Sequence, residues 1–210
     1  MPERTVALLQ TLRGVFIMGN HDREVLQIDP GPADPAEQNW TNWTRGQLSE
    51  RSLSFLASFR NPMVVERQGL RLRLVHGDLS RERYGDTRLW PDSPESTYAD
   101  LARRYAQTHI LFGHSHVQYS AERAGRRFVN PGGLGQPRLG QTVACYAVLE
   151  GGRFDLRAVR YNVARTAAAM DELPLPRELI EDWKQCYLAG TLPKRYRVRD
   201  FTALMVTGYR

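Results

Sequence analysis

Four of the five histidines in this 210-residue chain fall in three short segments, each of which contains a glycine and follows an apolar run. These polar segments span 19–22, 76–78 and 113–116. The apolar runs before them predict short buried strands over 14–18, 70–75 and 108–112. Because strand ends from one sheet converge at one edge, we expect the three polar segments to meet in space. The sequence therefore predicts one site built from distant parts of the chain.

The side chains in these segments suit a metal ion. Asn20, His76, His114 and His116 offer imidazole nitrogens and an amide oxygen, which zinc, iron, manganese and nickel accept as ligands. A single histidine is more often a polar residue satisfied within the fold, and we expect this of His109. If 114 and 116 lay in a strand, both rings would point to one face, whereas in a loop they can diverge toward two neighbouring metals.

Composition excludes several other classes of protein. The longest apolar run, over 143–149, is too short to cross a bilayer, and the sequence does not open on a basic and apolar leader. The two cysteines, Cys145 and Cys186, are far apart, so neither a disulfide scaffold nor a cysteine-bound zinc site is expected. We therefore expect a cytoplasmic protein without a membrane partner.

The formal net charge is +6, and nearly all of the positive charges are arginines. The planar guanidinium suits phosphate, so an anionic substrate or a nucleic-acid partner is consistent with this excess. The alternative is an arginine-favouring codon bias on a solvated surface. The arginines are scattered rather than clustered, which favours that alternative and makes nucleic acid an unlikely partner.

The order of predicted elements indicates an α/β fold with mixed sheets, since strands and helices alternate early and strands dominate later. We expect helices over 3–13, after a Ser49 cap, after Ser93–Pro94, and over 163–188. Polar or loop-like segments are expected over 19–22, 29–47 and 79–93. Hairpins are predicted for 63–67 with 70–75, 117–123 with 126–130, and 143–149 with 153–160.

The motifs G-N-H-D over 19–22, H-G at 76–77, G-H-S-H over 113–116 and N-P-G over 130–132 follow one another in order. Together they resemble the calcineurin-like metallophosphoesterases, in particular the small single-domain bacterial and archaeal phosphodiesterases. The resemblance implies a four-layer α/β/β/α sandwich with mixed sheets. It also implies a metallophosphoesterase domain over 1–190, followed by a basic tail over 191–210.

The resemblance further implies roles for individual residues. Asn20, His76 and His114 match ligands of one metal, and His116 matches a ligand of a second. His21 matches the group that contacts the substrate phosphate and protonates the leaving oxygen, and Asp22 matches the partner that fixes the tautomer of its ring. In a complete family site, two divalent transition metals (Mn, Fe, Zn or Ni) hold a hydroxide for in-line attack on phosphorus.

A glycine-rich loop follows the last of these motifs, over 130–138. Its glycines and Arg138 predict a backbone loop that faces the substrate phosphate, with Arg138 as a substrate-binding residue. The alternative is a plain turn that enters a hairpin, with Arg138 on the surface.

Members of this family begin with two motifs, D-x-H and G-D-x-x-D, that do not occur in this sequence. Asp78 is a poor substitute for the carboxylate that bridges the two metals. We expect the fold to be truncated at its N-terminus by roughly 40 to 50 family residues. An upstream in-frame translation is then expected to contain both motifs.

The expected function is metal-dependent hydrolysis of phosphate esters, in particular of small or nucleotide-like phosphodiesters. Two alternatives remain. One is an inactive module that binds metal or phosphate, and the other is a basic nucleic-acid-binding protein. The sequence also leaves self-association into an oligomer open.

Overall fold

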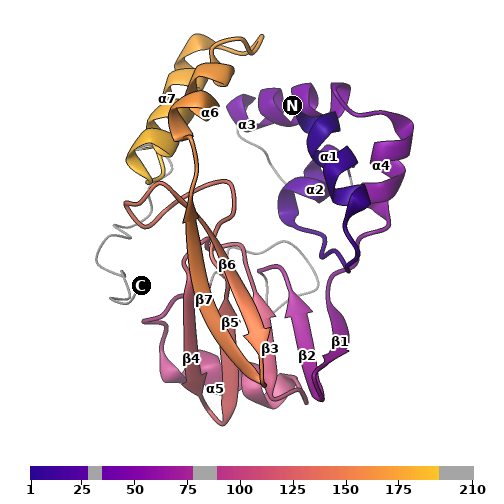
Figure 1. Cartoon of the computed structure of the whole chain (residues 1–210), viewed down its shortest axis with the longest axis vertical. Coiled ribbons are helices and arrows are strands. Elements are labelled where there is room, and N and C mark those ends of the chain that lie inside the picture. Colours follow the sequence, from indigo (N-terminus) through magenta and orange to yellow (C-terminus); the bar gives the residue numbers. More distant parts are fainter. Residues whose placement is uncertain (28–34, 78–88, 194–210) are drawn as a thin grey trace.

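The structure, a computed structural model, describes residues 1–27, 35–77 and 89–193 (Figure 1). Its main sheet has the strand order β1-β2-β3-β5-β4. The central pairs β2–β3 and β3–β5 are parallel, whereas the outer pairs β1–β2 and β4–β5 are antiparallel. The predicted α/β fold with a mixed sheet is therefore confirmed. The strands are β1 (Met63–Arg67), β2 (Leu70–Val75), β3 (His109–Phe112), β4 (Tyr119–Arg123) and β5 (Arg126–Asn130).

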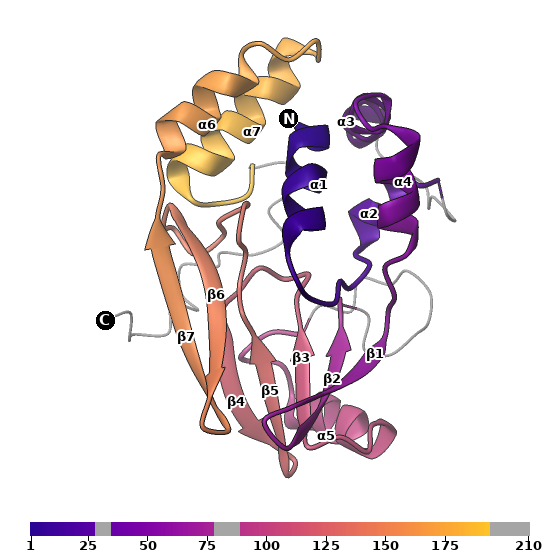
Figure 2. The ribbon, with the colours of Figure 1, turned by 45° about the vertical axis from the view of Figure 1, so that its right-hand side comes forward.

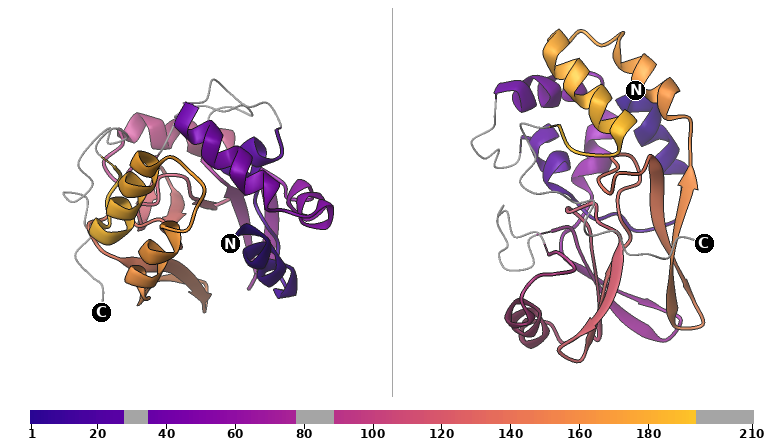
Figure 3. Two further views of the ribbon diagram at one scale, coloured as in Figure 1. Left: turned by 90° about the horizontal axis from the view of Figure 1, so that it is seen from above. Right: turned by 90° about the vertical axis from the view of Figure 1, so that its left-hand side faces the viewer.

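Helix α5 (Glu95–Arg104) covers one face of this sheet, and the hairpin of β6 (Val143–Glu150) and β7 (Arg153–Arg160) lies on the other side (Figures 2 and 3). The buried side chains of Tyr98 and Leu101 on α5 pack with those of the sheet in one apolar core. The hairpin is joined to the sheet through Gln118, whose amide donates to backbone carbonyls of both hairpin strands, at 3.0 and 2.9 Å.

The remaining helices lie beyond the carboxyl ends of β2 and β3 (Figure 1). They are α1 (Pro2–Thr11), α2 (Asn20–Val25), α3 (Pro35–Gly46), α4 (Glu50–Ala57), α6 (Val163–Met170) and α7 (Arg177–Ala189). A second apolar cluster joins α1, α2 and α4 through Val6, Val25, Leu53 and Leu56. Helix α2 is therefore packed on neighbouring helices as well as placed at the strand ends.

The predicted Ser49 cap is confirmed. The Ser49 hydroxyl accepts a hydrogen bond from Ser52 N, which satisfies one of the amides that a helix start leaves unpaired. Both serines also donate to the Glu3 carboxylate, at 2.9 Å, so the cap joins α4 to α1. The Ser49 backbone amide donates to the same carboxylate at 2.9 Å, and this hydrogen bond, followed by those of the two hydroxyls, holds the Glu3 pKa below its ordinary value.

The strand predicted over 14–18 is wrong. Only Ile17 forms a bridge, to Arg60, and Val15 is 46% exposed. An apolar run becomes a strand only where another strand pairs with it, and the part of the chain described here provides one bridge.

The loop predicted over 29–47 is wrong for 35–46, which form α3, and the polar turn at 19–22 is the start of α2. Ring contacts help to explain α3: Trp40 lies 6.2 Å from Trp43 on the same helix and 6.4 Å from Trp183 on α7. Such tertiary contacts outweigh the loop-forming composition of the flanking sequence.

Some predictions fall on residues outside the described ranges: the role of Asp78, the loop over 79–88 and the basic tail over 194–210. Within the described residues, Leu192 belongs to the main apolar core. No helix in the described ranges is long and apolar enough to span a bilayer.

Candidate active site

Three of the predicted metal ligands come together at the carboxyl ends of the central strands. His76 follows β2, His114 follows β3, and Asn20 begins α2. The His76 Nε2 atom lies 3.0 Å from Asn20 Oδ1. The rings of His76 and His114 are 5.1 Å apart, edge to face. The predicted convergence of these three residues is therefore present in the structure.

The backbone around these residues is closely packed. The Gly113 amide donates to the His76 carbonyl at 2.7 Å, which extends the parallel pairing of β2 and β3 beyond the strand ends. A Cβ on Gly77 would lie 2.4 Å from the Cβ of His114, closer than two such atoms can approach. Glycine at 77 is therefore required for His114 to lie where it does.

The two histidines of G-H-S-H lie in a loop and not in a strand. His114 and His116 have φ values of 62° and 57°, in the left-handed region that residues other than glycine seldom occupy. The fully buried Asn130 holds this loop, because its amide donates to Gly113 O and Ser115 Oγ. A conformation that costs free energy is thus maintained by surrounding hydrogen bonds, as is common at functional sites.

His116 has its own set of contacts. Its Nδ1 donates to the Gln136 carbonyl at 3.0 Å, which leaves Nε2 with the lone pair that a metal ligand requires. Burial, followed by the nearby Arg138 charge, lowers the His116 pKa to about 3. The charges of His76 and His114 act in the same direction, so His116 lies within electrostatic reach of both.

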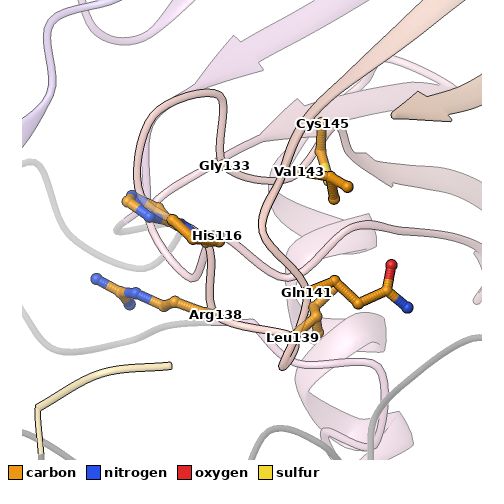
Figure 4. A pocket seen from close by; sticks show the side chains of 8 residues that line it. His116, Gly133, Arg138, Leu139, Gln141, Val143 and Cys145 are labelled. Carbon is orange, nitrogen blue, oxygen red and sulfur yellow. The ribbon is translucent and has the colours of Figure 1, made fainter. Parts of the chain in front are cut away.

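Arg138 is buried, which excludes the alternative that placed it on the surface. Its guanidinium donates to Gln136 Oε1 at 2.8 Å, and Nη1 lies 3.5 and 3.4 Å from the carbonyls of His114 and Ser115. Figure 4 shows its side chain alongside the His116 ring, at a pocket that Gly133 and Cys145 also line. Arg138 therefore contacts the backbone of the loop that carries His114 and His116, and it places a positive charge beside that loop.

His21 is the exposed member of the set, with 73% of its side chain accessible. Its Nδ1 lies 2.7 Å from Glu24 Oε2. The sequence predicted Asp22 as the partner of this ring, but the Asp22 carboxylate accepts a hydrogen bond from Gly19 N at 2.7 Å. Burial raises the Asp22 pKa, and the His21 charge partly offsets that effect.

Glu24 was missed by the sequence analysis. Its spacing from Asn20 and His21 places all three on one face once 20–25 is known to be helical. Burial acts to raise the Glu24 pKa. The hydrogen bond and the charge of His21, together with the hydrogen bond from the Asn20 amide, outweigh burial, so the Glu24 pKa lies below its ordinary value.

The His76 ring is also held in its neutral form. Burial, with a smaller contribution from the His21 charge, lowers the His76 pKa to about 4. The ring is therefore neutral at physiological pH, the form that binds metals.

These donors suit one divalent metal. Two ligands about 2.1 Å from a metal and at right angles lie roughly 3 Å apart, which matches the Asn20–His76 separation. Within 1–27, 35–77 and 89–193, no three His, Cys, Asp or Glu side chains form a group that could hold a metal ion.

Comparison with known proteins identifies the family. Residues 2–152 match the family model of the calcineurin-like phosphoesterase superfamily domain. An uncharacterized protein of Methanocaldococcus jannaschii is 25% identical over 207 residues, covering 86% of this chain and 79% of the relative.

Two solved structures share the fold. A metallophosphoesterase from Sphaerobacter thermophilus superposes with a TM-score of 0.73 at 25% identity, covering 90% of this chain and 82% of the other. A hypothetical protein from Pyrococcus horikoshii gives a TM-score of 0.72 at 20% identity, with coverage of 83% and 74%. The chain belongs to the calcineurin-like phosphoesterase superfamily, a family of metal-dependent phosphoester hydrolases.

Proposed function

We propose that this protein hydrolyses small, nucleotide-like phosphodiesters in a metal-dependent reaction. The observation that carries the proposal is the 3.0 Å contact between Asn20 Oδ1 and His76 Nε2. The His114 ring contacts the His76 ring, and the exposed His21 follows Asn20 in the sequence. We assign this activity to a domain over 1–190 of a cytoplasmic protein.

Asn20, His76 and His114 are proposed to hold one divalent transition metal, drawn from Mn, Fe, Zn and Ni, and His116 to serve a second. The support is the chemistry of the donors: neutral imidazoles and one amide oxygen at converging positions. A metal bound there supplies Lewis-acid polarisation of the phosphoryl oxygens. Arg138, buried beside His116, adds fixed positive charge that favours substrate phosphate.

His21 is proposed as the general acid. Its ring is exposed next to Asn20, and its Nδ1 lies 2.7 Å from Glu24 Oε2. A protonated ring there can deliver a proton to the leaving oxygen. Asp22 supports the arrangement through its charge and through its hydrogen bond to the start of α2.

The test separates proton delivery from metal binding. Loss of a general acid costs about 10²–10⁴ in rate, so His21→Ala is expected to lower kcat/KM by that range on an alkyl diester. The deficit should be much smaller for an aryl diester, whose phenolate leaves without a proton. Metal content should stay unchanged. An equal deficit on both diesters, or lost metal, would refute the general-acid role.

A further inference from the structure

We propose that Glu24 is a positioning residue that orients a metal ligand and the general acid with one carboxylate; this rests on the proposed function. Glu24 Oε1 accepts a hydrogen bond from Asn20 Nδ2 at 3.3 Å, and Oε2 lies 2.7 Å from His21 Nδ1. The two oxygens of one side chain thus contact two adjacent residues of the site.

Helix α2 makes this arrangement geometrically simple. Residues three and four apart on a helix share a face, so Glu24 lies beside both His21 and Asn20. The Glu24 side chain is only 22% exposed, so water competes little for its oxygens. Asp22 lies within the same helix, but its carboxylate is turned to the amide of Gly19.

Contact with Glu24 determines which end of the Asn20 amide faces the site. A carboxylate accepts hydrogen bonds and cannot donate them, so the Asn20 NH₂ group must face Glu24. Asn20 Oδ1 then lies on the side of His76, where it accepts a hydrogen bond from Nε2 at 3.0 Å, so the amide presents to the site the oxygen that can bind a metal. A flipped amide would present NH₂ to the metal and could not bind it.

The same carboxylate selects the tautomer of His21. Oε2 can only accept, so Nδ1 carries its proton and Nε2 becomes the atom that exchanges a proton with substrate. Glu24 therefore acts on the reaction through two other residues and need not touch the substrate.

Glu24→Gln provides a nearly isosteric test, because glutamine has one acceptor and one donor where glutamate has two acceptors. The glutamine oxygen can face Asn20 or His21, but not both, so its NH₂ group must reverse either the Asn20 amide or the His21 tautomer. Glu24→Ala removes both contacts. Glu172→Gln, which removes the same charge from an exposed position outside the helices, is the matched control.

Two readouts do not depend on turnover. The first is the affinity for Mn²⁺ or Co²⁺ without substrate, measured by calorimetry. The second is the His21 tautomer in metal-free protein at pH 8, from ¹⁵N chemical shifts of the ring. For loss of a group that orients a ligand, metal affinity typically falls about 10–100-fold. We expect this decrease in metal affinity in Glu24→Ala. In Glu24→Gln we expect either the same decrease in metal affinity or a change of His21 to the Nε2–H tautomer.

The proposal is overturned if wild-type His21 is mainly in the Nε2–H form, or if both Glu24 variants keep the wild-type tautomer and metal affinity. It is also overturned if Glu172→Gln causes the same losses, since the effect would then be one of net charge. A wild-type protein that shows the Nδ1–H tautomer and no hydrolysis would refute the proposed function while leaving the Glu24 contact intact.

Discussion

Asn20 Oδ1 lies 3.0 Å from His76 Nε2, although 56 residues separate them in the sequence. The contact forms because α2 begins where the carboxyl end of β2 also arrives (Figure 1). Two donors at this separation can share one metal ion.

Removing either donor should therefore weaken metal binding in the absence of substrate. We expect Asn20→Ala and His76→Ala each to lower Mn²⁺ affinity by at least about tenfold. Because the second site has only His116 as a proposed protein ligand, we expect at most about one tightly bound metal per 210-residue chain. Calorimetry with elemental analysis measures both. His109→Ala is the control, because His109 lies at the start of β3 and contacts Thr108. Unchanged affinity in both site variants would contradict the assignment.

Close packing at Gly77 predicts a second effect on the same site. In Gly77→Ala the new Cβ would overlap His114, so the ring must move. We expect lower metal affinity and a loss of about 1–3 kcal/mol in the free energy of unfolding, the usual cost of overpacking. Urea unfolding and metal titration measure the two effects.

Gly135→Ala is the matched control for that substitution, because a Cβ at Gly135 meets no atom within 4 Å. If Gly135→Ala and Gly77→Ala behave alike, the close approach at Gly77 does not position His114.

The metal-free protein should lose stability in mild acid. The pKa values of His76 and His116 in the folded protein are about 4 and about 3, below the ordinary 6.5 of histidine. As the pH falls below 6.5, the unfolded chain binds protons at these rings and the folded chain does not. The free energy of unfolding should thus decrease between pH 6.5 and about 4. His116→Asn should show a smaller decrease in urea unfolding with chelator present.

Comparison of His116→Asn with the wild-type chain separates the contribution of this histidine to the pH dependence from that of the carboxylates, which also titrate in acid. An identical pH dependence for His116→Asn and the wild-type chain would show that His116 is not held neutral by burial.

The convergence of the site was predictable because it depends on simple properties of the chain. Apolar runs that end in polar residues place His76 and His114 at one sheet edge, because β2 and β3 are parallel and their ends share that edge. Asn20 reaches the same edge at the start of α2, although the strand predicted before it is wrong. The Ser49 cap was predictable for a different reason: capping depends on residues that lie within one helical turn of each other in the sequence.

The rest depended on contacts between distant residues. Arg138 is buried because its guanidinium reaches carbonyls more than twenty residues away, and nothing local to 130–138 indicates this. Glu24 faces His21 only because 20–25 is helical, and a six-residue helix leaves little periodicity in the sequence. Similarly, α3 packs its Trp40 on Trp183, some 140 residues later.

The most direct test of the whole account is hydrolysis of bis(p-nitrophenyl) phosphate by chelator-treated protein, with and without added Mn²⁺. The account predicts no turnover without metal, turnover restored by Mn²⁺, and at least a tenfold lower rate in Asn20→Ala and His76→Ala than in His109→Ala. Metal binding at Asn20 and His76 without any metal-dependent hydrolysis of this diester would contradict it.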